Sequence, residues 1–248
     1  MRWTGFSWVL SLLCTGLIAD AHAQAVTRQE IAARLEAGTK DLRNLEAPGA
    51  DLSGLNFRGA NLFGASLKGA NLRGAQLEGC NLDVAILREA VLSEANLQNA
   101  SLFSAVLADA DLSGASLRGA RLMGNMEGAN FERADLSGVR AGADMRNQPM
   151  GLIRAVVTRG RFKGASLADA DFSRADFSFA DFTDADLRRV NLSKANLAGA
   201  TFRGANLEGA VLEGADIQSA DFRGAQGLDA VKGLDSVTGR ESALFDTP

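Results

Sequence analysis

The chain has 248 residues and a formal net charge of −4, from 26 Lys plus Arg against 30 Asp plus Glu. Such a balance argues against both a broad nucleic-acid-binding surface and a strongly acidic DNA mimic. With one His and two Cys, the chain also lacks the residues of most metal sites and nucleophilic triads.

Residues 1–23 have the pattern of a secretory signal peptide, with Arg2 before an apolar run and small residues before Gln24. We expect cleavage before Gln24 and a periplasmic or secreted protein. The apolar run is too short for a membrane span and no second one follows, so no transmembrane anchor is predicted. Cleavage removes His22 and Cys14, which leaves Cys80 without a disulfide partner.

Residues 24–38 predict a short N-terminal capping helix. Thr27 and Glu30 form a capping box, Ile31 and Leu35 share one face, and Gly38 marks the stop. Because a helix of about ten residues is marginal alone, we expect it to dock on one end of the structure that follows.

Residues 39–226 are organised by a period of five, strict from Leu52 to Leu122. A large apolar residue recurs at every fifth position, and a small one stands two places before it. Neither a helix nor a strand has this period, but a square coil does. We call each five-residue repeat a phrase. Its large and small apolar residues would point inward, the two residues after the large one would face water, and the end of the phrase would form the corner.

Four phenylalanines support four sides per coil, because they recur at intervals of twenty. In a four-sided coil they would stack directly above one another at the strand spacing of about 4.8 Å. The prediction is therefore a solenoid of about nine coils. The four residues are Phe162, Phe182, Phe202 and Phe222.

The phrase is irregular over residues 123–161. Leu122 and Phe162 are forty residues apart, which we interpret as two full but imperfect coils. The alternative is a protruding loop near residues 148–158 between two stacks. The five-residue repeat stops at residue 226. Residues 227–248 predict a C-terminal cap with a short helical turn, followed by a mobile tail from Glu241.

The phrases ANLRG at 70–74, ADLSG at 110–114 and ANLEG at 205–209 closely resemble the pentapeptide-repeat family. The resemblance implies an all-β fold, a right-handed four-sided parallel β-helix. The best understood members are dimeric DNA mimics that bind type II topoisomerases. The resemblance therefore implies two alternatives for this chain, a homodimer and a topoisomerase partner, although nucleic acid itself is not an expected ligand.

No enzyme, metal or cofactor is predicted. A run of four aspartates offers carboxylates, but each stands just before an inward Phe or Leu, where it would bond to backbone at the corner. Cys80 occupies the small inward slot, which favours a buried thiol. The four aspartates are Asp171, Asp176, Asp181 and Asp186.

Two outward features are candidate partner-binding sites. On one face, Phe63, Phe103 and Met123 follow inward residues, with Val84 beside them, and predict an apolar contact patch. Alternatively, these are scattered surface residues, or the N-terminal helix covers them.

The second feature is a basic segment, residues 138–163, in which Arg154, Arg159 and Arg161 contribute to a local excess of five positive charges. Lys163, Arg203 and Arg223 would extend it along the phenylalanine face. It could bind an anionic envelope polymer or lipid, or it could be an ordinary solvated face.

The sequence thus favours a non-enzymatic periplasmic scaffold for an unknown protein or cell-envelope component. The alternative, a binder or protector of type II topoisomerase, would require a cytoplasmic protein with a continuous acidic face.

Overall fold

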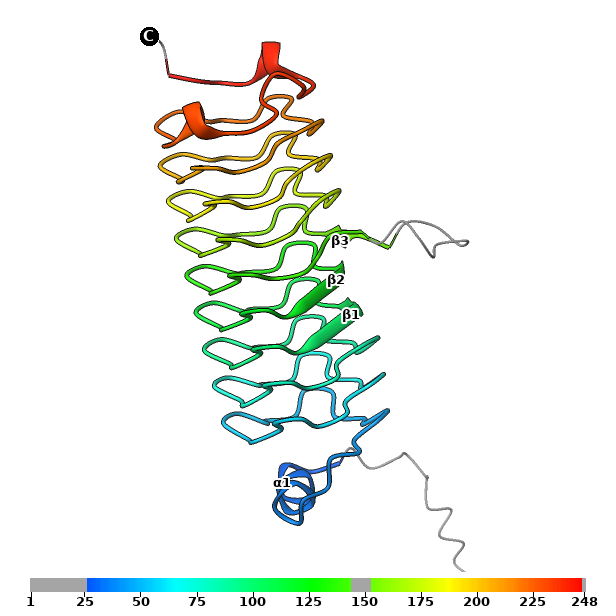
Figure 1. Cartoon of the computed structure of the whole chain (residues 1–248). Coiled ribbons are helices and arrows are strands. Elements are labelled where there is room, and N and C mark those ends of the chain that lie inside the picture. Colours follow the sequence, from blue (N-terminus) through cyan, green and yellow to red (C-terminus); the bar gives the residue numbers. More distant parts are fainter. Residues whose placement is uncertain (1–25, 144–152, 247–248) are drawn as a thin grey trace, which may run out of the picture.

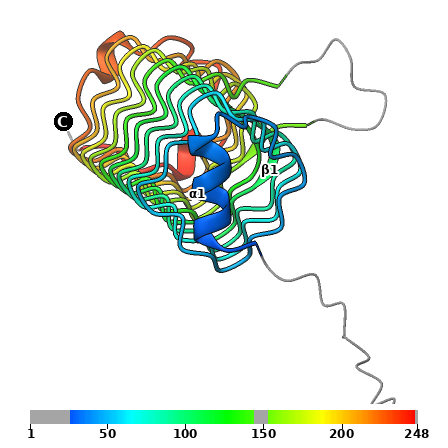
Figure 2. The same ribbon diagram turned by 90° about the horizontal axis from the view of Figure 1, so that it is seen from below.

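The protein is seen in a computed structural model that describes residues 26–143 and 153–246. Four-sided coils stack into a rod, with helix α1 (Arg28–Glu36) at one end (Figure 1). Viewed from the α1 end, the coils lie over one another as a tube (Figure 2). The predicted signal peptide and its cleavage site before Gln24 lie outside the described residues.

Each side of the rod is a ladder of parallel bridges between residues about one coil apart in the chain, and we name the sides by these residues. Face 1 comprises Asp41, Asn61, Asn81, Ser101, Arg121, Arg140, Asp171, Asn191, Val211 and Lys232. Face 2 comprises Glu46, Ser66, Ile86, Val106, Asn125, Val156, Asp176, Asn196, Asp216 and Thr238. Face 3 comprises Asp51, Asn71, Val91, Asp111, Asn130, Arg161, Asp181, Thr201, Asp221 and Leu244. Face 4 comprises Asn56, Gln76, Asn96, Ser116, Asp135, Ser166, Asp186, Asn206 and Gln226.

Three short strands turn the corner between face 1 and face 2. They are β1 (Ser101–Val106), β2 (Arg121–Asn125) and β3 (Ala155–Val156), which pair in parallel in the order β1-β2-β3. Elsewhere the ladders consist of isolated bridges, because each side is too short for a longer strand.

The repeated phrase produces this geometry through its hydrogen bonds. Leu62 donates its N–H to the carbonyl of Asn81 one coil on, at 2.7 Å. The polar residue before each inward Leu caps the corner, as where Asn81 Oδ1 accepts the N–H of Asp83 at 3.0 Å. The corner residue two places after the Leu has positive φ, such as 67° at Gly64, which glycine adopts without strain.

The predicted phenylalanine column is confirmed and is longer than expected. Adjacent rings along face 3 stack with centroids 4.6–5.2 Å apart. Phe131 precedes the four predicted members and Phe245 follows them. All the rings from Phe131 to Phe222 are buried.

Helix α1 begins with the capping box of Thr27 and Glu30. Ile31 is fully buried in the core, and Leu35 packs against it. Arg28 donates to the carbonyls of Asp51 and Ser53 at 3.0 and 2.8 Å. The helix therefore lies across the end of the stack and does not cover the patch predicted on face 1 (Figure 1).

The interpretation of residues 122–162 as two full coils is wrong, because Leu122 follows a face 1 residue and Phe162 a face 3 residue. Along face 3, the step from Asp111 to Asn130 is one residue short and the step from Asn130 to Arg161 is eleven too long. The shortage falls between Leu122 and Met126, where Gly124 has a φ of 139°.

The extra residues fall between Ala141 and Val157, next to the corner of faces 1 and 2. The stack continues across them, since Met126 donates its N–H to Val156 O at 2.7 Å. The rod is therefore one stack. Residues 148–152 of the predicted loop lie outside the described residues, whereas Ala155–Val156 form β3 and belong to the ladder.

The C-terminal turn was correctly predicted, but the mobile tail was not. Residues after Gly227 contain the 3₁₀ helices η1 (Leu228–Ala230) and η2 (Arg240–Ser242). Leu244 bridges to Asp221, and Phe245 stacks on Phe222. The chain up to Asp246 thus completes the last coil, because an uncovered aromatic column would leave apolar surface in water.

Candidate interaction surface

The predicted outward row follows face 1 through consecutive coils, as expected from its spacing of twenty. Phe63 is 42% exposed, Phe103 is half-buried, and Met123 is only 4% exposed. Phe103 and Met123 are direct partners across β1 and β2. Met123 is therefore not part of an exposed patch, because it lies in the shortened corner where β2 turns into Met126.

The exposed apolar patch consists instead of Phe63, Val84 and Ile86. Val84 and Ile86 are 47% and 44% exposed; Val84 is the residue at the corner between faces 1 and 2, and Ile86 is on face 2. Val84 has a φ of 62°, a left-handed conformation that is a true outlier for a β-branched residue. A strained residue that remains about half exposed is a feature expected at a functional surface.

The three arginines of the predicted basic site each face a carboxylate of a neighbouring coil. Arg154 lies 3.2 Å from Asp176, and Arg161 lies 3.5 Å from Glu132. Arg159 pairs with Glu127. The predicted excess counted only neighbours in sequence, whereas the coil brings residues about twenty to thirty positions away alongside.

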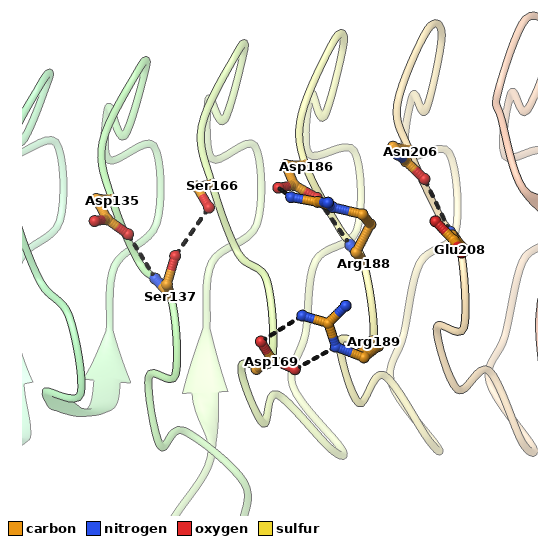
Figure 3. Close-up of polar contacts among 9 residues, drawn as sticks. All are labelled: Asp135, Ser137, Ser166, Asp169, Asp186, Arg188, Arg189, Asn206 and Glu208. Carbon is orange, nitrogen blue, oxygen red and sulfur yellow. Dashed lines mark hydrogen bonds and ion pairs between the residues drawn. The ribbon is translucent and has the colours of Figure 1, made fainter.

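The same neutralisation occurs elsewhere on the rod. Arg189 donates two hydrogen bonds to Asp169 of the preceding coil, from Nε to Oδ1 at 2.6 Å and from Nη2 to Oδ2 at 2.7 Å (Figure 3). This hydrogen bonding lowers the pKa of Asp169. Most of these pairs are exposed, so each contributes little to stability.

Arg203 and Arg223, which were expected to extend the basic face, both bond to Asp221. Arg203 Nε lies 2.6 Å from Asp221 Oδ2, and Arg223 Nη2 lies 2.8 Å from the same oxygen. These bonds, chiefly those from Arg223, hold the pKa of Asp221 well below its usual range. The carboxylate is almost buried, at 9% exposure, and joins two coils.

The run of four aspartates has the predicted structural role. Asp171 Oδ1, for example, accepts the N–H of Ser173 at 3.0 Å and an amide hydrogen of Asn191 at 3.0 Å. Each of the other three likewise accepts the N–H two residues on.

Cys80 is buried as expected, and burial raises its pKa to about 11, so that it stays a thiol at neutral pH.

Sequence reasoning missed two arginines, Arg121 and Arg140, which are bridge partners on face 1. Both occupy the slot before the inward residue, where most coils have Asn, Asp or Ser. That departure from the phrase was the available signal. The count of positive charges over residues 138–163 included Arg140 but not Arg121.

Within residues 26–143 and 153–246, no group of three or more His, Cys, Asp or Glu residues is placed to hold a metal ion. The helices in this part of the chain are also too short or too polar to cross a membrane.

None of the curated proteins compared with the chain matches it. Among solved structures, HetL from the cyanobacterium Nostoc, a pentapeptide repeat protein involved in heterocyst differentiation regulation, is 27% identical over 88% of this chain and 94% of its own, with a TM-score of 0.43. A pentapeptide repeat protein of the Arabidopsis thaliana thylakoid lumen is 27% identical over 50% of this chain and 88% of its own, with a TM-score of 0.30. QnrB1, a plasmid-mediated fluoroquinolone resistance protein, is 16% identical over 83% of this chain and 92% of its own, with a TM-score of 0.35.

These low TM-scores carry no argument about function, and the family assignment rests on the repeats themselves. The family model of pentapeptide repeats matches in 8 copies, over residues 49–83, 85–124, 100–147, 158–193 and 191–226. These segments span well over half of the chain and coincide with the coils. The chain therefore belongs to the pentapeptide-repeat family, whose fold is the right-handed quadrilateral β-helix.

Proposed function

We propose that this protein is a non-enzymatic scaffold of the bacterial periplasm that binds a protein partner through the patch Phe63, Val84 and Ile86. The signal-like residues 1–23 support the location. In this proposal α1 caps a rod of about nine coils. Because the ladders fix the backbone in advance, binding to the rod costs little ordering entropy.

The exposed apolar cluster of Phe63, Val84 and Ile86 carries this proposal, and the conformation of Val84 adds to it, because Val84 is the only β-branched residue among the non-glycine residues with positive φ in the described part of the chain. Glycine occupies the same corner slot in many coils, for instance at Gly64, and would be unstrained there. Valine at φ 62° costs about 1–3 kcal/mol of strain. Almost half of its side chain remains in water, so the folded monomer alone does not recover that cost.

Two alternatives receive less support. An anionic envelope polymer would need an uncompensated basic surface, whereas Arg154, Arg159 and Arg161 are each paired with a carboxylate. A topoisomerase partner would need a continuous acidic face like that of DNA. Several acidic residues on the described coils instead pair with arginines, as Asp169 pairs with Arg189 (Figure 3).

The patch is tested by the double variant Phe63→Ser/Ile86→Ser, with Phe179→Ser as a matched control. Phe179 is 68% exposed and stands on the far side of face 2 from the patch, at its corner with face 3. We expect both proteins to fold with stability within about 0.5 kcal/mol of wild type, because the side chains are superficial.

A photo-crosslinking residue at position 63 should capture a discrete partner in cells, whereas one at position 179 should not. The double variant should lose this product when the crosslinker is placed at Asp83 beside the patch. Sedimentation of the purified chain would reveal whether the partner is a second copy. Equal crosslinking from positions 63 and 179 would reject the patch.

The location is tested by fractionating cells and sequencing the protein's N-terminus. We expect a periplasmic protein that begins at Gln24. An intact cytoplasmic protein would contradict the proposal and favour the topoisomerase alternative.

A further inference from the structure

Arg121 and Arg140 lie next to each other on face 1, in consecutive coils. Their backbones are bridged in parallel, which places them at the strand spacing of about 4.8 Å. Both side chains are at exposed positions. Two positively charged side chains therefore start from neighbouring backbone positions on one side of the rod.

This arrangement departs from the local rule of the fold. In the same slot one coil earlier than β1, Asn81 caps the corner by accepting the N–H of Asp83. Arginine has no acceptor and cannot make this bond. Departures from a local rule without an evident structural gain are expected at functional sites.

Neither guanidinium has a carboxylate within 4.0 Å among the residues that the structure describes. Arg161 provides the comparison, because it occupies the same slot on face 3 and has Glu132 at 3.5 Å. The bridge partner above Arg140 is Asp171, but its Oδ1 is already bonded to Ser173 and Asn191.

Both arginines are nevertheless held in place. The Arg121 guanidinium carbon lies 4.0 Å from the centre of the Phe103 ring, a cation–π contact. Arg140 Nη2 donates to the carbonyl of Gly119 at 3.3 Å. The two guanidinium groups are thus partly ordered before any ligand arrives, which reduces the entropy lost on binding.

A shallow cavity of about 320 Å³ lies beside them, lined by Arg121, Met123, Arg140, Gly142 and Asp171. Gly142 allows Asp171 to approach the backbone closely, since a Cβ at this position would come within 2.7 Å of both Asp171 Cγ and Ser173 Oγ. Buried Met123 forms an apolar wall. The cavity is therefore lined by two arginines, one apolar side chain and the carboxylate of Asp171, whose Oδ1 is occupied by Ser173 and Asn191.

We propose that Arg121 and Arg140 form a binding site for an oxyanion, a carboxylate or phosphate group of a small ligand. Arginine forks match both groups in geometry and charge, and neither guanidinium is neutralised by a carboxylate within 4.0 Å among the described residues. Phe103, predicted from sequence as a contact residue, acts in this site by positioning Arg121. The site stands independently of the apolar patch.

The test is a titration of the mature chain, followed by NMR of the arginine side-chain N–H groups, with inorganic phosphate in one arm and acetate in the other. Ionic strength is held constant with chloride. We expect saturable shifts at Arg121 and Arg140 and at least tenfold weaker binding in Arg121→Gln or Arg140→Gln. Arg161→Gln is the matched control and should bind like wild type.

The arm that saturates at the lower concentration identifies the preferred oxyanion. Thermal unfolding provides a second readout, because a ligand that binds only the folded state raises Tm. The preferred anion should raise the Tm of wild type and Arg161→Gln but not of the two site variants. Unsaturable shifts of equal size at all exposed arginines, in both arms, would overturn the proposal.

Discussion

The coils before β2 and those after β3 share one backbone ladder but use their side chains differently. Before β2, face 3 is filled by leucines such as Leu72, and the corner of faces 1 and 2 exposes apolar groups. After β3, face 3 is filled by stacked phenylalanines, whereas ion pairs link successive coils in both halves, as Arg73 with Glu94 and Arg189 with Asp169.

The comparison shows which positions are free to vary. The backbone bonds and the inward small residues are alike in both halves, so they define the rod and carry no functional difference. The halves differ in the bulk of the column and in the outward groups. The bulk of the column should affect the stability of the rod, and the outward groups should affect binding. Variants can test these two effects separately.

The largest expected effect is in the phenylalanine column. Phe202 is fully buried, with its ring 5.1 Å from that of Phe182 and 4.6 Å from that of Phe222. Phe202→Ala should lower the free energy of unfolding by about 3–5 kcal/mol through lost burial and a cavity. Chemical denaturation measures this, and a loss below about 1 kcal/mol would show that the column is not a packed core.

The boundary between the halves is tested at Gly124. A Cβ there would lie 3.0 Å from Ala105 N and 3.2 Å from Ser104 C, in a backbone with φ 139°. Gly124→Ala should cost at least about 2 kcal/mol, because backbone atoms cannot move aside. Gly114→Ala is the control at a regular corner, where the nearest atom would be 3.9 Å away. Equal melting temperatures of the two variants would contradict the assignment of a tight corner.

The ion pairs of the second half are tested at Asp221. Asp221→Asn should cost about 2 kcal/mol at pH 7, because its charge-assisted bonds to Arg203 and Arg223 are weakened. The folded pKa of Asp221 is lowered, so its contribution is full above the unfolded value of about 3.9 and is lost as pH falls below it.

The gap between wild type and Asp221→Asn should therefore narrow by about 1.4 kcal/mol per pH unit below that value. Denaturation curves at pH 7, 4 and 3 would measure it. A gap that is unchanged at pH 3 would rule out this linkage.

The smallest effect is expected at an exposed pair of the first half. Arg73 lies 2.7 Å from Glu94, and both side chains are more than 60% exposed. Glu94→Gln should change stability by no more than about 0.5 kcal/mol, and less with added salt. A loss comparable with that of Asp221→Asn would mean that the exposed pairs also hold the coils together.

Much of the fold could be predicted because each coil repeats the same local chemistry. The capping box of Thr27, the inward Leu and Ala residues, the stacked phenylalanines and the corner-capping aspartates depend on neighbours in sequence or on a fixed interval of twenty. The last coil was less predictable, because Phe245 joins the column only after a path that does not follow the phrase.

The candidate surfaces were predicted less well, because they depend on distances across coils. One residue is missing at the corner of Leu122 and Met126, where Met123 is buried, and the bridge partners of the following coil are nineteen residues apart. The pairing of Arg159 with Glu127 follows from the inserted residues between Ala141 and Val157. Val84 was noticed as outward, but its strain required backbone angles.

Val84→Gly tests the central claim most directly, because stability and association should change in opposite directions. Glycine relieves the left-handed strain, so the free energy of unfolding should rise by about 1 kcal/mol after the entropy cost of glycine. Crosslinking to the partner from position 83 should fall, because the exposed isopropyl group is gone.

Glu89→Gly, at another exposed left-handed corner with φ 58°, should leave association unchanged. A Val84→Gly protein that is more stable and no longer crosslinks is the predicted result. A protein that crosslinks as well as wild type would contradict the claim that the patch around Val84 is the interaction surface.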